Sequence, residues 1–110
     1  MTDTALDAAI AATPAPKITL ADIHGKIANV AYHAHDHLTL CILTLKNGFF
    51  VVGKSAPVSV ENFSLEIGQK VAHNDAVRQV WELEGYLLRQ RLFEEQEWDK
   101  ELQAAGHPPL

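Results

Sequence analysis

The sequence predicts an α+β fold, with a short helix, a two- or three-stranded antiparallel meander and a long C-terminal helix. Two observations lead to this prediction. Apolar runs at residues 38–45 and 49–52 flank the turn-forming pair Asn47-Gly48, which is the pattern of a β-hairpin. After Pro57, apolar side chains recur every three or four residues as far as Leu92, which is typical of an amphipathic helix.

The first expected element is a short helix over about residues 20–29. Thr19 can cap its N-terminus, and Asp22 follows three residues later, where its carboxylate can bond back to the cap. Apolar residues then follow at helical spacing: Ile23, Ile27 and Val30.

The hairpin is expected to turn at Asn47-Gly48. A two-residue type I′ turn requires positive φ at both central positions, which Asn and Gly tolerate best. That turn sets the expected cross-strand pairs: Lys46 with Phe49, Leu45 with Phe50, Thr44 with Val51, Leu43 with Val52 and Ile42 with Gly53.

Both faces of this hairpin are apolar, so neither can be left in water. Either helices cover both faces or a second subunit covers one, and because few helices are expected, the sequence predicts a homo-oligomer. A third strand is expected at the edge of the sheet over residues 32–35, followed by a turn at Asp36-His37.

The long helix is expected over about residues 62–92, capped by Ser59 or Asn62. A continuation through the charged residues 94–103 is left open. Gly68 and Gly85 each cost a helix about 1 kcal/mol relative to Ala, so they indicate close backbone packing or a kink.

A kinked or split helix is favoured over a straight one. The expected break is at His73-Asn74-Asp75, because Asn and Asp can cap a second helix there.

The chain of 110 residues is expected to form one domain at residues 18–93, with a flexible arm at 1–17 and a charged helical extension and tail at 94–110. Its net charge of −5 makes nucleic acid an unlikely partner, since binding phosphates requires surplus Lys and Arg. The sequence shows no membrane span or export signal, and the lone Cys41 in an apolar strand fits a reducing compartment. A reducing cytosol is therefore expected.

The pattern from Thr19 to Leu92 resembles a family of small tailed-phage proteins, named for gene products of coliphage N4 and Shigella phage Sf6. The residues that carry the resemblance are Asn47, Gly48, Gly53, Ser55, Ala56, Asn62, Phe63, Gly68, Trp81, Glu84, Gly85 and Tyr86. The resemblance implies a phage or prophage origin and an accessory rather than virion-structural gene. It implies no reaction and no catalytic residues.

The candidate ligand site is centred on Glu84-Gly85-Tyr86. A glycine there lets a backbone or a planar ligand approach, and Tyr86 could stack on a base. Side chains and a helix end that could bind a phosphate complete the set: Lys54, Ser55, Asn62, Arg78 and Arg89. An ordinary solvated helix face is the alternative interpretation.

His33, His35 and His37 form the one cluster with the composition of a metal site, and on a strand they would share a face. Solvated loop histidines are the more common explanation, because a metal site needs further ligands and the sequence supplies none at a matching spacing. The sequence also lacks the motifs of nucleophilic catalysis, so no cofactor and no enzymatic activity are expected.

These features favour a non-enzymatic phage protein that counters host defence or physiology by sequestering a small nucleotide-type ligand within an oligomer. One alternative is an adaptor whose helix face around residues 94–101 binds and inhibits a host protein. The other is a metal-dependent enzyme built on the histidine cluster.

Overall fold

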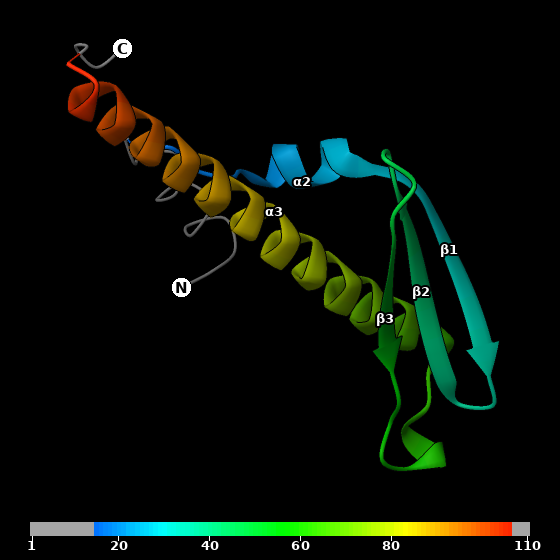
Figure 1. Ribbon diagram of the computed structural model, residues 1–110. Coiled ribbons are helices and arrows are strands. Elements are labelled where there is room, and N and C mark those ends of the chain that lie inside the picture. The colour runs from blue at the N-terminus through cyan, green and yellow to red at the C-terminus, as the bar shows by residue number, and fades with distance from the viewer. Residues whose placement is uncertain (1–14, 107–110) are drawn as a thin grey trace.

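The computed structural model describes residues 15–106, except for the side chain of Asn62. It contains a short helix, a three-stranded antiparallel sheet and a long helix, which confirms the predicted α+β fold (Figure 1). The elements are α2 (Leu20–Lys26), β1 (Ile27–His35), β2 (Leu38–Leu45), β3 (Phe50–Ser55), a 3₁₀ turn η1 (Val60–Asn62) and α3 (Leu65–Ala104). Most of the arm predicted for residues 1–17, and residues 107–110 of the predicted tail, lie outside the described residues.

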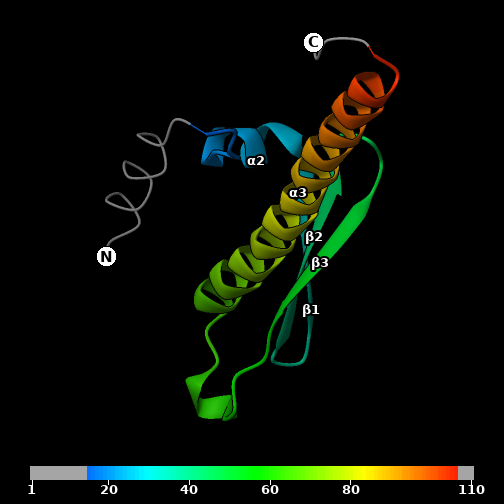
Figure 2. The same ribbon diagram turned by 60° about the vertical axis from the view of Figure 1, so that its left-hand side comes forward.

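The sheet and α3 form two layers. The strand order is β1-β2-β3, a simple meander, and α3 crosses one face of the sheet against β3 and β2 (Figures 1 and 2). The opposite face of the sheet is not covered by any described element (Figure 2). The C-terminal part of α3, orange and red in Figure 1, extends beyond the sheet. Because 40 residues of helix are about 60 Å long, α3 accounts for most of the 68 Å length of the molecule.

Helix α2 begins as predicted and ends earlier. Thr19 and Asp22 form the predicted capping box, with each side chain bonded to the other's backbone N–H. The helix stops at Lys26, so the prediction of residues 20–29 was wrong at its C-terminal end. Ile27 and Val30 follow a helical spacing, yet both lie in β1, where pairing with β2 outweighs the local pattern. Strand β1 is accordingly longer than the predicted strand at residues 32–35, and the turn at Asp36-His37 is confirmed.

The hairpin between β2 and β3 has a three-residue loop rather than the predicted two-residue turn. The N–H of Gly48 donates to the carbonyl of Leu45 at 2.9 Å, and the N–H of Leu45 donates to that of Phe49 at 2.8 Å. Within this loop only Gly48 has positive φ, at 90°. The loop is thus a turn followed by a left-handed glycine, a common alternative for this sequence pattern.

The longer loop moves the register by one residue from the prediction. Leu43 pairs with Val51 instead of Val52, and Ile42 pairs with Val52 instead of Gly53. A shift of one residue in register moves each side chain of a strand to the other face of the sheet, relative to the partner strand. The observed register puts Leu43 and Val51 together under α3, where both are buried, and leaves Ile42 and Val52 on the uncovered face.

Helix α3 is one continuous helix of 40 residues. The predicted caps Ser59 and Asn62 belong to the 3₁₀ turn instead, and Ser64 caps α3 by accepting a hydrogen bond from the N–H of Ile67. The predicted break at His73-Asn74-Asp75 was therefore wrong. Asp75 instead accepts a hydrogen bond from the backbone of Lys54, so its carboxylate joins the helix to β3 rather than capping a second helix. The open continuation is also resolved, since α3 runs through residues 94–103 to Ala104.

Small residues bring α3 close to the sheet. Ala72, Ala76 and Val80 are fully buried at intervals of four, and Ala72 and Ala76 face Gly53 on β3. A Cβ atom on Gly53 would lie 2.1 Å from the carbonyl oxygen of Ala72, so no other residue fits there without moving the helix. Gly68 likewise approaches the side chain of Thr39 on β2, which confirms close packing for this glycine. Gly85 does not follow that prediction, because nothing lies within 4 Å of the place its Cβ would take.

Among the described residues, no helix combines the length and the apolar character needed to cross a membrane. Cys41 is fully buried within the sheet–helix core, as its apolar surroundings in the sequence predict.

Candidate ligand-binding site

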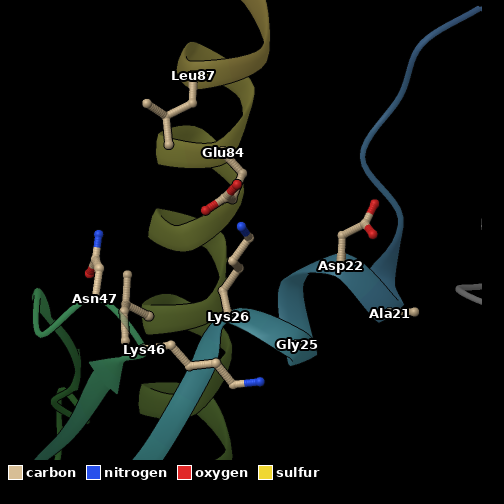
Figure 3. A pocket seen from close by; sticks show the side chains of 9 residues that line it. Ala21, Asp22, Gly25, Lys26, Lys46, Asn47, Glu84 and Leu87 are labelled. Carbon is tan, nitrogen blue, oxygen red and sulfur yellow. The ribbon is translucent and has the colours of Figure 1, made fainter.

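The candidate site lies where α2, the β2–β3 loop and α3 meet. The backbone N–H of Lys46 in the loop donates to the carbonyl of Lys26 at the end of α2, at 2.9 Å, which joins the two segments. Ile23, fully buried in the core, anchors α2 against them. These contacts place Lys26 and Lys46 at the junction; in Figure 3 the Lys26 side chain extends toward Glu84 on α3, and the Lys46 side chain points away from it.

Two adjoining hollows form a groove along this junction, which we call the basic groove. The first is about 590 Å³ and lies between α2, the loop and α3; Figure 3 shows Lys26 extending toward Glu84 across it. The second is about 460 Å³ and continues along α3 toward Arg91. Both hollows share Asp22, Lys26, Glu84 and Leu87.

The charge of the basic groove is positive although the chain is acidic. Four cationic side chains line it, and two acidic ones: Lys17, Lys26, Lys46 and Arg91, against Asp22 and Glu84. Asp22 is already engaged in the capping box, and the hydrogen bonds from Thr19 lower the pKa of its carboxyl group. A chain of net charge −5 thus concentrates positive charge at one place, which suits an anionic ligand.

An apolar, aromatic surface adjoins the groove on the β3 side of α3. A hollow of about 490 Å³ and a smaller one of about 190 Å³ both contact Phe49, Leu83 and Tyr86. Phe49 is 55% exposed and Tyr86 is 69% exposed. The smaller hollow shares Glu84 and Leu87 with the basic groove, so the two surfaces meet at one turn of α3. An aromatic surface beside cationic groups can bind a planar, negatively charged molecule.

The structure brings only part of the predicted site together. Glu84 and Tyr86 line these hollows, but Gly85 lines none of them. Because a helix turns about 100° per residue, Leu83 and Leu87 face the smaller hollow and Gly85 lies on the opposite side of α3. Arg89 is exposed on α3 and lines none of the four hollows described above. The side chain of Asn62 is outside the described part of the chain.

The remaining predicted residues lie at the C-terminal end of β3, away from the basic groove. Lys54 and Ser55 end this strand, and the N–H of Lys54 donates to Asp75 at 3.0 Å. Arg78 lies nearby and pairs with Asp75 at 3.1 Å and with Glu82. The hydrogen bond from the Lys54 backbone and then Arg78 lower the pKa of Asp75, and the hydrogen bond to Asp75 raises the pKa of Arg78. Arg78 is thus already paired, and six helical residues, about 9 Å, separate it from Glu84.

Sequence reasoning missed the cations of the basic groove. Lys17, Lys26, Lys46 and Arg91 come from four separate segments, and no spacing in the sequence relates them. Asn47-Gly48 was the one available signal, because a tight loop places Lys46 and Phe49 on either side of it.

The histidine cluster is split by the fold. Strand alternation puts His33 and His35 on the same face of the sheet, as predicted. It is the uncovered face, where they lie opposite Leu40 and Leu38. His37 lies in the following turn, so the predicted single face for all three was wrong. Within residues 15–106, no three His, Cys, Asp or Glu side chains are placed to hold a metal ion together.

A sequence model of the phage protein (N4 Gp49/phage Sf6 gene 66) family matches residues 18–92. The match spans α2, the sheet and α3 as far as Leu92, and includes Lys26 and Lys46. No curated protein and no solved structure is significantly similar to the chain.

Proposed function

The chain belongs to the phage protein (N4 Gp49/phage Sf6 gene 66) family and is a phage accessory protein, and from that premise we propose that it sequesters a small nucleotide-type ligand. In this proposal the protein is not an enzyme. It acts in the host cytoplasm, binds the ligand unchanged and so counters host defence or physiology.

The observation that supports this proposal most is the basic groove beside the aromatic surface. A nucleotide has an anionic phosphate and a planar base, and the two surfaces offer a partner for each. Lys26 and Lys46 would face the phosphate, and Tyr86 or Phe49 would stack on the base. Leu83 and Leu87 of α3 lie where the two surfaces meet.

Homo-oligomerisation is part of the proposal. The face of the sheet opposite α3 carries the exposed side chains of Phe50 and Val52 beside the half-buried Ile42 and Leu40. A contiguous apolar face of this kind is typical of protein–protein interfaces, and a second copy is a partner that is always available.

The test is depletion from solution. The protein is incubated with ATP, cyclic AMP and a cyclic dinucleotide, the mixture is filtered through a membrane that retains protein, and the filtrate is analysed by chromatography. At least one nucleotide should be depleted, and heating the retained protein should release it unchanged. Release of an altered nucleotide would show catalysis instead, and no depletion of any of the three would contradict the proposal.

Matched lysine variants locate the site. Lys26→Ala and Lys46→Ala should each lower affinity by at least about tenfold, because a hydrogen bond to a charged group contributes roughly 1.5–3 kcal/mol. Lys70→Ala, at an exposed position on α3 outside the described hollows, is the control and should leave affinity unchanged. Lys54→Ala tests the other end of β3; a loss there alone would move the site to Lys54 and Ser55.

The adaptor remains a second candidate because of one observation. Phe93 and Trp98 are 48% and 53% exposed on the part of α3 that extends beyond the sheet (Figure 1). A host protein bound along residues 94–101 would cover such side chains. If wild-type protein captures a host protein from lysate and the Trp98→Ala variant does not, while no nucleotide is depleted, the adaptor function replaces sequestration.

A further inference from the structure

Side chains of α3 form hydrogen bonds with the backbone of one edge strand of the sheet, β3. The carbonyl of Val52 on the edge strand β3 accepts a hydrogen bond of 2.8 Å from Nε2 of Gln79. The N–H of Lys54, two residues on, donates to the carboxylate of Asp75 at 3.0 Å. These α3 side chains bond the outward backbone groups of β3, so this edge is closed to a further strand.

The same two bonds show which backbone groups the other edge exposes. Because the backbone N–H and C=O groups of Val52 and Lys54 point outward, away from β2, those of the alternate residues Val51 and Gly53 point toward β2. Their partners on β2 are Leu43 and Cys41, whose backbone groups point back toward β3. The backbone groups of the alternate residues of β2 therefore point toward β1.

These residues of β2 are Ile42, Leu40 and Leu38, and they pair on β1 with Ala31, His33 and His35. The backbone N–H and C=O groups of these three β1 residues therefore point toward β2. The residues between them direct their backbone N–H and C=O groups outward, away from the sheet: Val30, Tyr32 and Ala34. Strand β1 is the edge of the sheet, and α3 packs against β2 and β3 rather than beneath β1.

The side chains of the same residues are also uncovered. Val30 and Tyr32 lie opposite Leu43 and Cys41, on the face that α3 covers elsewhere. Leu43 and Cys41 are fully buried, whereas Val30 is 40% exposed and Tyr32 is 43% exposed. Residues 30–35 contain no Pro, Lys, Arg, Asp or Glu, the residues that usually prevent edge strands from pairing.

We propose that β1 pairs antiparallel with β1 of a second copy, which joins two three-stranded sheets into one sheet of six strands. An antiparallel pair of identical strands is related by a two-fold axis, so this one edge is complementary to itself. The bonds would form among Val30, Tyr32 and Ala34 of the two copies, because these are the residues that face outward. The side chains of Val30 and Tyr32 would then meet their counterparts in the gap between the two α3 helices.

A second copy accounts both for the open backbone edge of β1 and for the exposed side chains of Val30 and Tyr32. A peptide strand from another protein could bond the open edge, but it would not bring a second α3 helix to enclose Val30 and Tyr32. A nine-residue strand is about 30 Å long, enough for a continuous ladder of bonds along β1.

The inference adds an interface at the sheet edge to the one proposed on the open face of the sheet, and it is independent of ligand binding. Its test uses Ala34→Pro, since proline removes an N–H that makes no bond within one chain and is tolerated at such edge positions. Light scattering should give wild-type protein a mass of at least twice 12.1 kDa, and the folded Ala34→Pro variant half the wild-type mass. The control Ala34→Thr keeps the N–H and should keep the wild-type mass.

Hydrogen exchange gives a second, local readout. The amides of Val30, Tyr32 and Ala34 should be protected in wild-type protein, and lose protection on dilution and in Tyr32→Lys, which places like charges close together. A monomeric wild type, or a folded Ala34→Pro variant of wild-type mass, would overturn the inference. Depletion of a nucleotide is measured separately on the same proteins, so failure of the assembly and failure of the proposed function give different results.

Discussion

Gly53 on β3 lies so close to Ala72 on α3 that a Cβ atom at position 53 would be 2.1 Å from the Ala72 carbonyl oxygen. This contact sets the distance between the two layers of the fold. It also holds Asp75 and Gln79 of α3 within hydrogen-bonding distance of β3, so closure of the β3 edge depends on it.

The first prediction is that Gly53→Ala destabilises the protein by about 3 kcal/mol, the upper part of the range for overpacking a core. The clash is with the backbone of α3, which cannot rotate away as a flexible side chain can. Urea denaturation followed by circular dichroism measures the change. A loss below about 1 kcal/mol would show that α3 can shift away from the sheet at little cost.

The second prediction concerns Gly85, which serves as the matched control for Gly53. Gly85→Ala should raise stability by up to about 1 kcal/mol, because alanine favours the helix and the new methyl group meets nothing within 4 Å. Gly85 lines none of the hollows of the candidate site, so the same variant should deplete nucleotide as wild type does. Reduced depletion would mean that the ligand binds the side of α3 that carries Gly85.

The third prediction is that Thr39→Val stabilises the protein by about 1 kcal/mol. Thr39 is buried, and its Oγ1 atom has no hydrogen-bond partner. Valine keeps the shape and removes the unsatisfied hydroxyl group. Thr39→Ser does the reverse and should lower the melting temperature; a lower melting temperature for Thr39→Val would indicate a bound water or other partner at Oγ1.

The fourth prediction concerns pH. Asp75 has a folded-state pKa below its usual value of 3.8, because its carboxylate accepts the Lys54 N–H and pairs with Arg78. The stability that it supplies is present above the unfolded pKa and is lost as the pH falls through the folded pKa. The stability advantage of wild type over Asp75→Asn should therefore be constant from neutral pH to about pH 5 and shrink below about pH 4.

Urea midpoints measured across that pH range check this prediction. Asp75→Ala is the companion variant, since asparagine keeps an oxygen that can accept the Lys54 N–H and alanine does not. An advantage that instead grows on acidification would mean that the carboxylate is not stabilised in its charged form.

The elements of this fold were largely predictable from local signals. Thr19 and Asp22 predict the start of α2, Asn47-Gly48 predicts a hairpin, and the apolar periodicity predicts most of α3. Each signal is a preference of a few neighbouring residues for one backbone conformation. Errors arose where such preferences compete, as at Ile27 and at His73-Asn74-Asp75, where a contact with another strand decided the outcome.

The candidate site was less predictable. Glu84 and Tyr86 were identified because a glycine between them is unusual in a helix, but the cations of the basic groove were not. The backbones of Lys26 and Lys46, for example, are joined by a hydrogen bond although the two residues are 20 positions apart, and nothing in either segment indicates that contact.

By itself the sequence determined the kind and order of the elements and the family to which the chain belongs, because caps, turns and apolar periodicity are encoded by neighbouring residues. Only the tertiary structure decided the hairpin register, the edge that α3 closes and the place where positive charge gathers. Each of these depends on contacts between residues far apart in the chain, such as Gln79 with Val52 and Gly53 with Ala72, whose free energies outweigh the small differences among local alternatives.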